Sequence, residues 1–453
     1  MGRPVTARVS PGSGKTEAGV LHLIDHKLGD HKGGRRVWLE GKRLVDAGFR
    51  DGVRYQVAAQ GDALVLQLSA TGTHKVSRGG VERPIVDLIT RALGSPVERV
   101  QVAFYPKRIT LTLHPIDAAA RRRLSRVNDR IAQGRKLRLG SVCHGGGVAS
   151  SAILRGLPAA EMALAVEQNA DYLAQSLRRG PLAQGGVSFE CDLGDLGSSP
   201  EMLAQLPEVD VLEAGLPCIS ASRAGRAKKG LAQAEDDQAT ADLAHAFLNV
   251  VAWTRPATIV LENVPEYADT ASAAMIRRNL ERLGYRLSER LIDGAAWSLE
   301  ARQRWILVAT SDRAADLDQL QGGSRPAALG EVLDRRTPAA AWRSTAALDA
   351  QLADARAKRQ GFARGRKLLT AADTSVPTLR RGYQKGGKCD VRLAHPSRPG
   401  VARLFSAAEH ARIKGIDPAL VSGLSEKKAH EVLGQSVIAP AFTALGAVIG
   451  ARS

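Results

Sequence analysis

Short apolar runs alternate with helix-length segments from about residue 138 to residue 312. The runs are Leu139–Cys143, Met162–Glu167, Val209–Ala214, Thr258–Asn263 and Trp305–Thr310. Short strands separated by helices are typical of βαβ units with a buried parallel sheet. From about 313 to 402 the sequence is rich in Gly, Arg and Ala, and helix-like Ser406–Lys414 and an apolar stretch follow. The pattern predicts a doubly wound (Rossmann-like) α/β domain with an irregular insertion.

The first 137 residues follow a different pattern. Strands are expected at Arg36–Glu40, Arg54–Ala58, Ala63–Leu68, Val100–Tyr105 and Arg108–Leu113, the last two as a hairpin. Helices are expected at Ile85–Leu93 and Ile116–Ala132. Residues 1–34 are expected to be loosely ordered, and Thr71–Gly80 to be a linker. This predicts an α+β extension with a basic β-rich segment, 1–70, and a second part, 71–137.

Composition narrows the class of protein. The chain has 453 residues, 44% of them hydrophobic, which excludes wholesale disorder and suggests about two to four domains. Four cysteines exclude a disulfide scaffold and fit a reducing cytosol. Val437–Ala451 is too short to span a bilayer, and the N-terminus has no signal-peptide pattern. We expect a soluble cytoplasmic protein with no membrane partner and no metal centre.

The positive charge is unevenly placed. The formal net charge is +18, which suggests nucleic acid or an anionic membrane as a partner. Residues 1–140 hold 26 Lys and Arg against 12 Asp and Glu, and residues 321–400 hold 16 against 6. The remainder has a net charge of −6. The sequence therefore predicts an acidic body with two basic appendages, although such asymmetry also serves solubility alone.

Three segments predict a site for a nucleoside-containing cofactor. SVCHGGGV (141–148) lies between a strand and a helix, where Gly145 and Gly147 let the backbone approach a ligand. Glu167, at a strand end about twenty residues later, is placed to bind ribose hydroxyls. Asp192 follows another expected strand. Taken singly, the glycines also suit a tight turn, and the carboxylates also suit a solvated surface.

Three further segments suggest catalysis. Val209–Cys218 is a strand that runs into a Pro-Cys turn, so Cys218 is a candidate nucleophile or a buried structural cysteine. Glu262 ends the apolar run TIVLEN, where a carboxylate either has a chemical task or reaches solvent. Arg302 and Arg304 alternate at the mouth of a strand, and are either directed to one site or solvated.

Together these motifs resemble the cytosine-C5 DNA methyltransferase family, in that family's linear order, over 138–312 and 403–453. RLFSAAEHARIKGI (403–416) and LGQSV (433–437) are similar to its ninth and tenth motifs, and VPTLRRGYQKGG (376–387) resembles the end of its target-recognition region. Departures include Cys143 for Phe, Val148 for Gly, Leu216 for Pro, Ile219 for Gln, Glu300 for Gln and Gln435 for Asn. Since these cluster at the cofactor pocket, the transferred group need not be plain methyl.

The resemblance implies a set of roles. Cys218 would attack C6 of a flipped cytosine, Glu262 would contact its N3/N4 edge, and Arg302 and Arg304 would contact O2. S-adenosylmethionine would be the cofactor. It would be bound by a set of residues from both ends of the catalytic region, namely Cys143, Gly145, Gly147, Glu167, Asp192, Gln435 and Ser436.

The resemblance also implies the domain division and the partners. Residues 138–312 and 403–453 would form the catalytic domain, and 313–402 a smaller irregular target-recognition domain. The partner would be double-stranded DNA, with a cognate restriction endonuclease as a further candidate and a bacterial, phage or plasmid origin. RNA cytosine-C5 methylation and a catalytically decayed DNA-binding regulator remain alternatives. Residues 1–137 are either a DNA-binding or regulatory module or a structural cap, and the oligomeric state is open.

Overall fold

The computed structural model describes residues 19–31, 34–79, 83–90, 99–217, 242–357 and 367–451. Contacts between residues divide the chain into two compact units, Met1–Ala119 and Ala120–Ser453. The N-terminal unit contains two antiparallel sheets and the short helix α1 (Lys42–Asp46). The larger unit contains the expected α/β domain.

The larger sheet of the N-terminal unit has six strands, and the smaller one has four. The order in the larger sheet is β1 (His22–Lys27), β9 (Arg99–Tyr105), β10 (Arg108–Leu113), β5 (Ala63–Leu68), β4 (Arg54–Gln60) and β6 (His74–Lys75). The order in the smaller sheet is β2 (Gly29–His31), β3 (Gly34–Glu40), β8 (Pro84–Thr90) and β7 (Ser77–Arg78). Strands from both sides of residue 70 thus share one sheet, and the expected division between 1–70 and 71–137 falls within it.

Several local predictions for this unit are confirmed and others are wrong. The hairpin is confirmed, with Tyr105 paired to Arg108. The helix expected at Ile85–Leu93 is wrong, because Pro84–Thr90 is a strand that pairs with β3. Val86 and Leu88 are buried while Asp87 and Ile89 are exposed, which is the two-residue period of a strand. The loosely ordered segment and the linker likewise contain strands, β1 and β2 in the first and β6 and β7 in the second.

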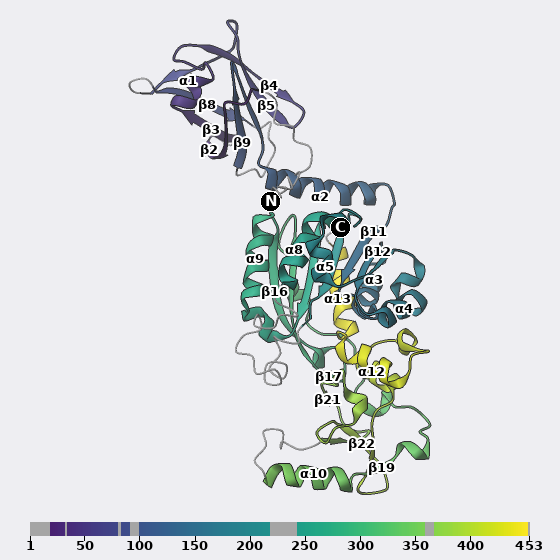
Figure 1. Ribbon diagram of the computed structural model, residues 1–453. Helices are drawn as coiled ribbons and strands as arrows, with labels where there is room; N and C mark the ends of the chain where they lie inside the picture. Colours follow the sequence, from purple (N-terminus) through teal and green to yellow (C-terminus); the bar gives the residue numbers. More distant parts are fainter. Residues whose placement is uncertain are drawn as a thin grey trace, which may run out of the picture. The chain divides into compact units, whose positions relative to one another are not determined.

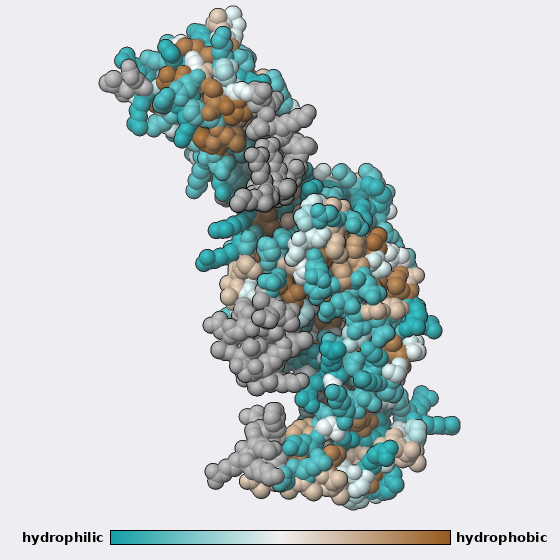
Figure 2. All heavy atoms as spheres, viewed as in Figure 1, coloured by the Kyte–Doolittle hydropathy of each residue, from teal (hydrophilic) through white to brown (hydrophobic). Residues whose placement is uncertain are grey.

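The N-terminal unit exposes apolar as well as basic side chains. Leu21, Leu23, Trp38 and Ile89 are all more than one-third exposed. Hydrophobic side chains gather on this unit in Figure 2. Arg36 lies over the ring of Trp38 and forms a bidentate ion pair with Asp87, with 2.8 and 2.9 Å between the paired atoms. The positive charge of Arg36 is therefore balanced by Asp87, beside the exposed indole of Trp38.

A seven-stranded sheet forms the centre of the larger unit (Figure 1). Its order is β13 (Val187–Glu190), β12 (Ala160–Glu167), β11 (Leu137–Val142), β14 (Val211–Gly215), β15 (Thr258–Asn263), β18 (Gln303–Thr310) and β16 (Arg286–Asp293). The first five strands are parallel, as the apolar runs predict. β18 is antiparallel to both β15 and β16, so the sheet is mixed at this end. The polar edge strand β16 was not predicted from the pattern.

Helices cover both faces of this sheet and enclose two hydrophobic cores. One core includes α3 (Val148–Gly156), α4 (Ala170–Arg179), α12 (Glu426–Gln435) and α13 (Ala439–Gly450). The other includes α5 (Leu193–Ser198), α6 (Pro200–Leu203), α8 (Leu243–Thr254) and α9 (Ala271–Arg282). Gly156 allows α3 to approach α13, because a Cβ there would lie 1.8 Å from the carbonyl oxygen of Thr443. The chain's last helix is thus part of the domain that begins near residue 137.

The insertion is small and mostly irregular, as expected. Its strands β19 (Arg343–Ser344), β23 (Val401–Arg403), β22 (Arg392–Ala394) and β20 (Leu368–Leu369) form one sheet. It also contains α10 (Ala346–Ala357), and its return strand β21 (Val376–Pro377) pairs with β17 (Glu300–Ala301). Its own core includes Tyr383, Phe405 and Ile413, the last from α11 (Ala407–Ile413). The insertion is therefore packed against the elements that follow it.

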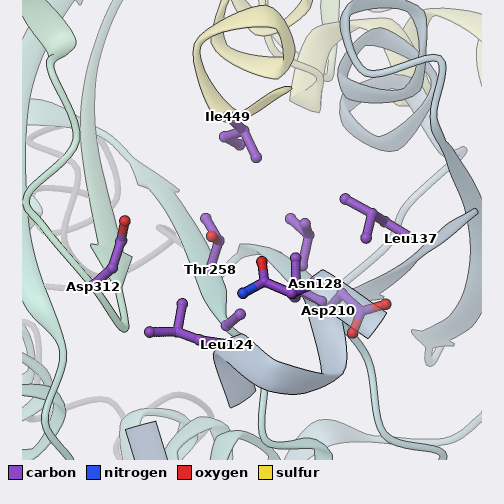
Figure 3. A pocket seen from close by; sticks show the side chains of 10 residues that line it. Leu124, Asn128, Leu137, Asp210, Thr258, Asp312 and Ile449 are labelled. Carbon is purple, nitrogen blue, oxygen red and sulfur yellow. The ribbon is translucent and has the colours of Figure 1, made fainter. Parts of the chain in front are cut away.

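The Arg-rich helix α2 (Pro115–Ala132) is bound to the amino end of the seven-stranded sheet. Arg126 and Arg130 pair with the buried Asp210 at 2.9 and 3.2 Å. Arg123 donates to Ser311 at 2.7 Å. Beside these pairs, α2 and the sheet line a cavity of about 220 Å³ (Figure 3). These contacts favour the structural-cap alternative for this helix.

No single helix among the described residues is long and apolar enough to cross a membrane. α12 and α13 together pass the same test of length and composition, but the chain bends by 47° between them.

Candidate active site

Several of the predicted site residues lie where the parallel strands end, at the carboxyl edge of the seven-stranded sheet. β11 leads into the glycine loop, defined as Cys143–Gly147, and β12 ends at Glu167. β13 is followed by Asp192, and β15 ends with Glu262 and Asn263. Because parallel strands share a direction, these segments meet at one edge, which is where open α/β sheets bind ligands.

The glycine loop holds the Glu167 carboxylate through backbone hydrogen bonds. The N–H of Gly145 donates to Oε2 at 2.7 Å, and the N–H of Asn169 donates to Oε1 at 2.9 Å. Cys143, Gly145 and Gly147 all have positive φ angles, which is costly for the cysteine. A Cβ on Gly145 would meet no atom within 4 Å. The loop therefore presents open backbone beside a fixed carboxylate.

The other side of the loop is packed against α12. A Cβ on Gly146 would lie 2.7 Å from Cγ1 of Val432, so only glycine allows this approach. Near the end of α12, Gln435 donates from Nε2 to the hydroxyl of Tyr172 at 3.1 Å. Ser436 donates to the carbonyl of Leu433. The structure thus brings the loop and the LGQSV segment together from the two ends of the domain.

Asp192 is held at the start of α5, and its negative charge acts on the thiol of Cys143. Oδ1 of Asp192 accepts from the N–H groups of Gly194 and Asp195 at the start of α5, at 2.7 and 3.3 Å. Burial, followed by the charges of Glu167, Glu213 and Asp192, raises the pKa of the Cys143 thiol. Cys143 is therefore a neutral thiol, and its surroundings favour a cation rather than an anion.

A buried polar network behind the glycine loop was not predicted from the sequence. Glu213 Oε2 accepts from the hydroxyls of Ser141 and Ser150 at 2.6 and 3.0 Å. His144 lies 2.9 Å from Ser141 and 2.7 Å from Ser176. The Ser141 hydroxyl uses its hydrogen to donate to Glu213, so it accepts from His144. His144 Nδ1 therefore donates to Ser141, and Nε2 accepts from the Ser176 hydroxyl. The network joins β14, the loop and α4.

Burial sets the protonation of this network. Desolvation raises the pKa of Glu213 to about 7, against the two serine hydrogen bonds that lower it. Desolvation also lowers the pKa of His144 to about 4, so the imidazole is neutral. A sequence signal was present, because Glu213 interrupts the apolar strand VLEAG. A charged residue inside a buried strand indicates a satisfied polar cluster.

Glu262 lies beside the turn that leads to Cys218. Gly215 and Glu262 are paired across β14 and β15, and a Cβ on Gly215 would lie 3.6 Å from the Glu262 carboxylate. Asn263 donates to the carbonyl of Leu216 at 3.1 Å, which ties the two strand ends together. Cys218 itself lies outside the described residues, which stop at Pro217 in this segment.

The two predicted arginines bind different partners. Arg304 forms an ion pair with Glu262, with 2.5 Å between Nε and Oε1. Arg302 is buried and donates to the carbonyl of Gly434 at 3.0 Å, with Glu300 3.5 Å away. Arg304 is therefore placed at the carboxylate of the site, while Arg302 contacts the chain next to Gln435.

No group of three or more His, Cys, Asp or Glu side chains in the described ranges is placed to hold a metal ion.

Comparisons with known proteins point to one family. The family model described as C-5 cytosine-specific DNA methylase matches residues 189–451. The Type II methyltransferase M.NlaX of Neisseria lactamica is 25% identical over 251 residues, which cover 54% of this chain and 76% of that protein.

Two solved structures share the fold. The Dnmt2 methyltransferase of S. pombe has a TM-score of 0.55 and 17% identity. EhMeth of Entamoeba histolytica has a TM-score of 0.53 and 13% identity. Each comparison covers 70% of this chain and 99% of the other. At these identities the likeness concerns the fold, which is that of a methyltransferase domain.

Proposed function

The chain belongs to the C-5 cytosine-specific DNA methylase family, and on this premise we propose that it methylates C5 of a flipped cytosine in duplex DNA through a covalent Cys218 adduct. The resemblance inferred from the motifs is confirmed by the family match. The observation that carries the proposal is the Arg304–Glu262 ion pair beside Gly215, three residues before Cys218. This pair supports the proposal because it orients a carboxylate beside Gly215, in the segment that continues to Cys218.

S-adenosylmethionine is the cofactor of this family, and the residues present fit it. Glu167 is fixed at a strand end with open backbone at Gly145, which suits a ribose and the adjoining chain of the ligand. Glu167 and Asp192 make the surroundings electronegative, which suits a cationic sulfonium. Gln435 would close the pocket from α12 through its contact with Tyr172. When bound, the cofactor supplies an electrophilic methyl group.

In the proposed reaction, the Cys218 thiolate adds to C6 of cytosine, and the displaced electron pair makes C5 a carbon nucleophile. Glu262 hydrogen-bonds the N3/N4 edge and keeps N3 protonated as charge develops. Arg304 holds the Glu262 carboxylate in place and faces the base with its remaining donors. After methyl transfer, loss of the C5 proton and cleavage of the C6–S bond release Cys218.

The family description and the recognition region of about 90 residues, 313–402, favour DNA over RNA, and the positive charge of this insertion suits a nucleic acid of either kind. Cations exposed on the insertion can contact phosphates, and they include Arg335, Arg336, Arg343, Lys367, Arg381, Lys385 and Arg398. C6 is inaccessible in a stacked duplex, so the base must leave the helix at a cost of a few kcal/mol. Phosphate contacts would offset this cost and make binding salt-dependent.

The proposal is tested by incubating the protein and labelled S-adenosylmethionine with duplex DNA or with tRNA. We expect label in DNA and a covalent complex on 5-fluorocytosine DNA. Cys218→Ala should abolish transfer but retain DNA binding, whereas the exposed-cysteine control Cys389→Ala should keep both. Label in tRNA alone would favour the RNA alternative, and DNA and cofactor binding without transfer or trapping would favour a decayed regulator.

Two further measurements would identify the target DNA sequence and the chemical group that is transferred. Methylation of a plasmid, followed by sequencing of modified cytosines, gives the recognition site. Mass spectrometry of the product base shows whether the group is plain methyl. A short palindromic site would favour pairing with a cognate restriction endonuclease, as the Type II relative suggests.

A further inference from the structure

Three charged side chains lie buried together below the site. Glu300 and Lys414 are 0% exposed and Arg302 is 4% exposed. Lys414 Nζ lies 3.2 Å from Glu300 Oε2, and Arg302 Nη1 lies 3.5 Å from Glu300 Oε1. Burying one carboxylate with two cations is costly, so this cluster needs a compensating role.

The cluster joins three chain segments that are distant in sequence. Glu300 Oε1 accepts from the N–H of Leu379 at 2.7 Å, within the return from the insertion. Lys414 donates to the carbonyls of Leu433 and Ser436 at 2.7 and 2.9 Å. Arg302 donates to the carbonyl of Gly434 between them. Together, Lys414 and Arg302 bind three carbonyls around the end of α12.

This end of α12 is connected to the residues assigned to the cofactor site. Gln435 reaches Tyr172, whose N–H donates to the side chain of Asn169, and the N–H of Asn169 binds Glu167. Gly434 is closely packed against the insertion, because a Cβ there would lie 2.4 Å from the backbone of Arg380 and Arg381. A shift of Lys414 would therefore move Gln435 and also the part of the insertion that contains Arg380 and Arg381.

We propose that Lys414 and Glu300 are positioning residues, which hold the end of α12 and thereby set the affinity of the cofactor site. Lys414 acts through the carbonyls of Leu433 and Ser436. Glu300 acts through Lys414, as the buried carboxylate that pairs with its ammonium group. Neither residue touches the reacting atoms.

The electrostatics of the cluster agree with this assignment. The pKa of Lys414 is lowered to about 7, chiefly by desolvation and then by Arg302 and Arg304, while Glu300 acts to raise it. His410 also faces Lys414, and its own pKa is lowered well below the usual value by burial and then by Lys414. Among the described residues that act on Lys414, Glu300 is thus the one anion, and its removal would leave like charges together.

The test measures S-adenosylhomocysteine binding by calorimetry without nucleic acid, so it does not depend on the DNA assignment. We expect Lys414→Met to raise Kd at least tenfold, and Glu300→Gln, which keeps an acceptor for Leu379, to raise it at least threefold. The double variant should bind within about twofold of Lys414→Met, because coupled residues are non-additive. Asp210→Asn, which removes a buried ionic partner at the opposite edge of the sheet, should lower Tm but leave Kd within twofold.

Other outcomes overturn the inference. An unchanged Kd with a lowered Tm in Lys414→Met or in Glu300→Gln would show that the cluster serves stability alone. Additive losses in the double variant would show that Glu300 does not act through Lys414. If Lys414→Met does not fold, Glu300→Gln decides by the same Kd measurement.

Discussion

Arg304 and Glu262 form an ion pair across two antiparallel neighbours, β18 and β15, with Nε and Oε1 2.5 Å apart. Both side chains are largely buried, so the pair is little screened by solvent. Arg304 lies near the start of its strand and Glu262 near the end of its own. The pair therefore sits at the carboxyl edge of the sheet, where the segment leading to Cys218 also begins.

Removal of Arg304 should impair catalysis more than folding. Arg304→Ala removes the guanidinium that is paired with the Glu262 carboxylate, and we expect kcat to fall at least about 100-fold, as for loss of an oriented charged donor. Transfer of labelled methyl groups under single-turnover conditions measures this. The exposed Arg286, at the far end of β16, provides a control variant, Arg286→Ala, which should keep near-normal kcat. Equal losses in both variants would contradict a specific role for Arg304.

Glu213 should make stability depend on pH. Its folded pKa is raised to about 7 from an ordinary 4.5, so between these values the folded state binds more protons than the unfolded state. The contribution of Glu213 to stability should therefore fall as pH rises through this window, by about 1.4 kcal/mol per pH unit at most. Urea unfolding at pH 5, 6, 7 and 8 should show this fall in the difference between the wild type and Glu213→Gln, because the buried neutral histidines His144 and His410 contribute the opposite slope in both proteins. Glu161→Gln, at an exposed carboxylate, should keep the wild-type slope.

The contact between Gly146 and Val432 should control docking of α12. Gly146→Ala places a methyl 2.7 Å from Val432 Cγ1, and we expect overpacking to cost about 1–3 kcal/mol and to weaken cofactor binding. Thermal unfolding and calorimetry with S-adenosylhomocysteine check both effects. Val432→Ala in the same chain should restore much of the loss, since it removes the clashing carbon. A double variant no better than Gly146→Ala would place the defect in the loop backbone instead.

The arginines of α2 should contribute to stability rather than to nucleic-acid binding. Arg126→Ala leaves buried Asp210 with Arg130 but without its closest partner, which should destabilise the protein by about 2–4 kcal/mol. Duplex affinity at fixed salt should stay within twofold. The exposed neighbour Arg122 supplies the comparison, because Arg122→Ala should leave stability unchanged. A weaker duplex affinity in Arg126→Ala alone would restore the DNA-binding alternative for this helix.

The pattern of apolar and polar residues predicted the secondary structure correctly where a single local feature decides it. The apolar runs predicted the buried parallel strands because such strands need continuous hydrophobic sequence. The pattern gave a wrong prediction at Pro84–Thr90, because this apolar segment is too short for its sequence to distinguish a strand from a helix. The pairing of β8 with β3 decided that element, and the segment alone does not encode its partner.

The candidate site shows the same division. Motif order identified the family, and it named Glu167 and Glu262, because residues after parallel strands must meet at one edge. Arg304 was named from its motif, and it reaches the same edge because its strand β18 is antiparallel to β15. The sequence did not predict the network of Glu213 with its serines or the pairing of Glu300 with Lys414, because these partners lie far apart in the chain.

By itself, the sequence determined the fold class, the family and the polarity of the sheet edge that carries the site, because strand periodicity and motif order are local properties. Only the tertiary structure decided which charges are buried together, which glycines are required by close packing, and that α2 is held by Asp210. The physical reason is that burial and pairing depend on partners that are distant in the sequence, such as Gln435 and Tyr172, which are 263 residues apart. The cost of an isolated buried charge makes those partners decisive.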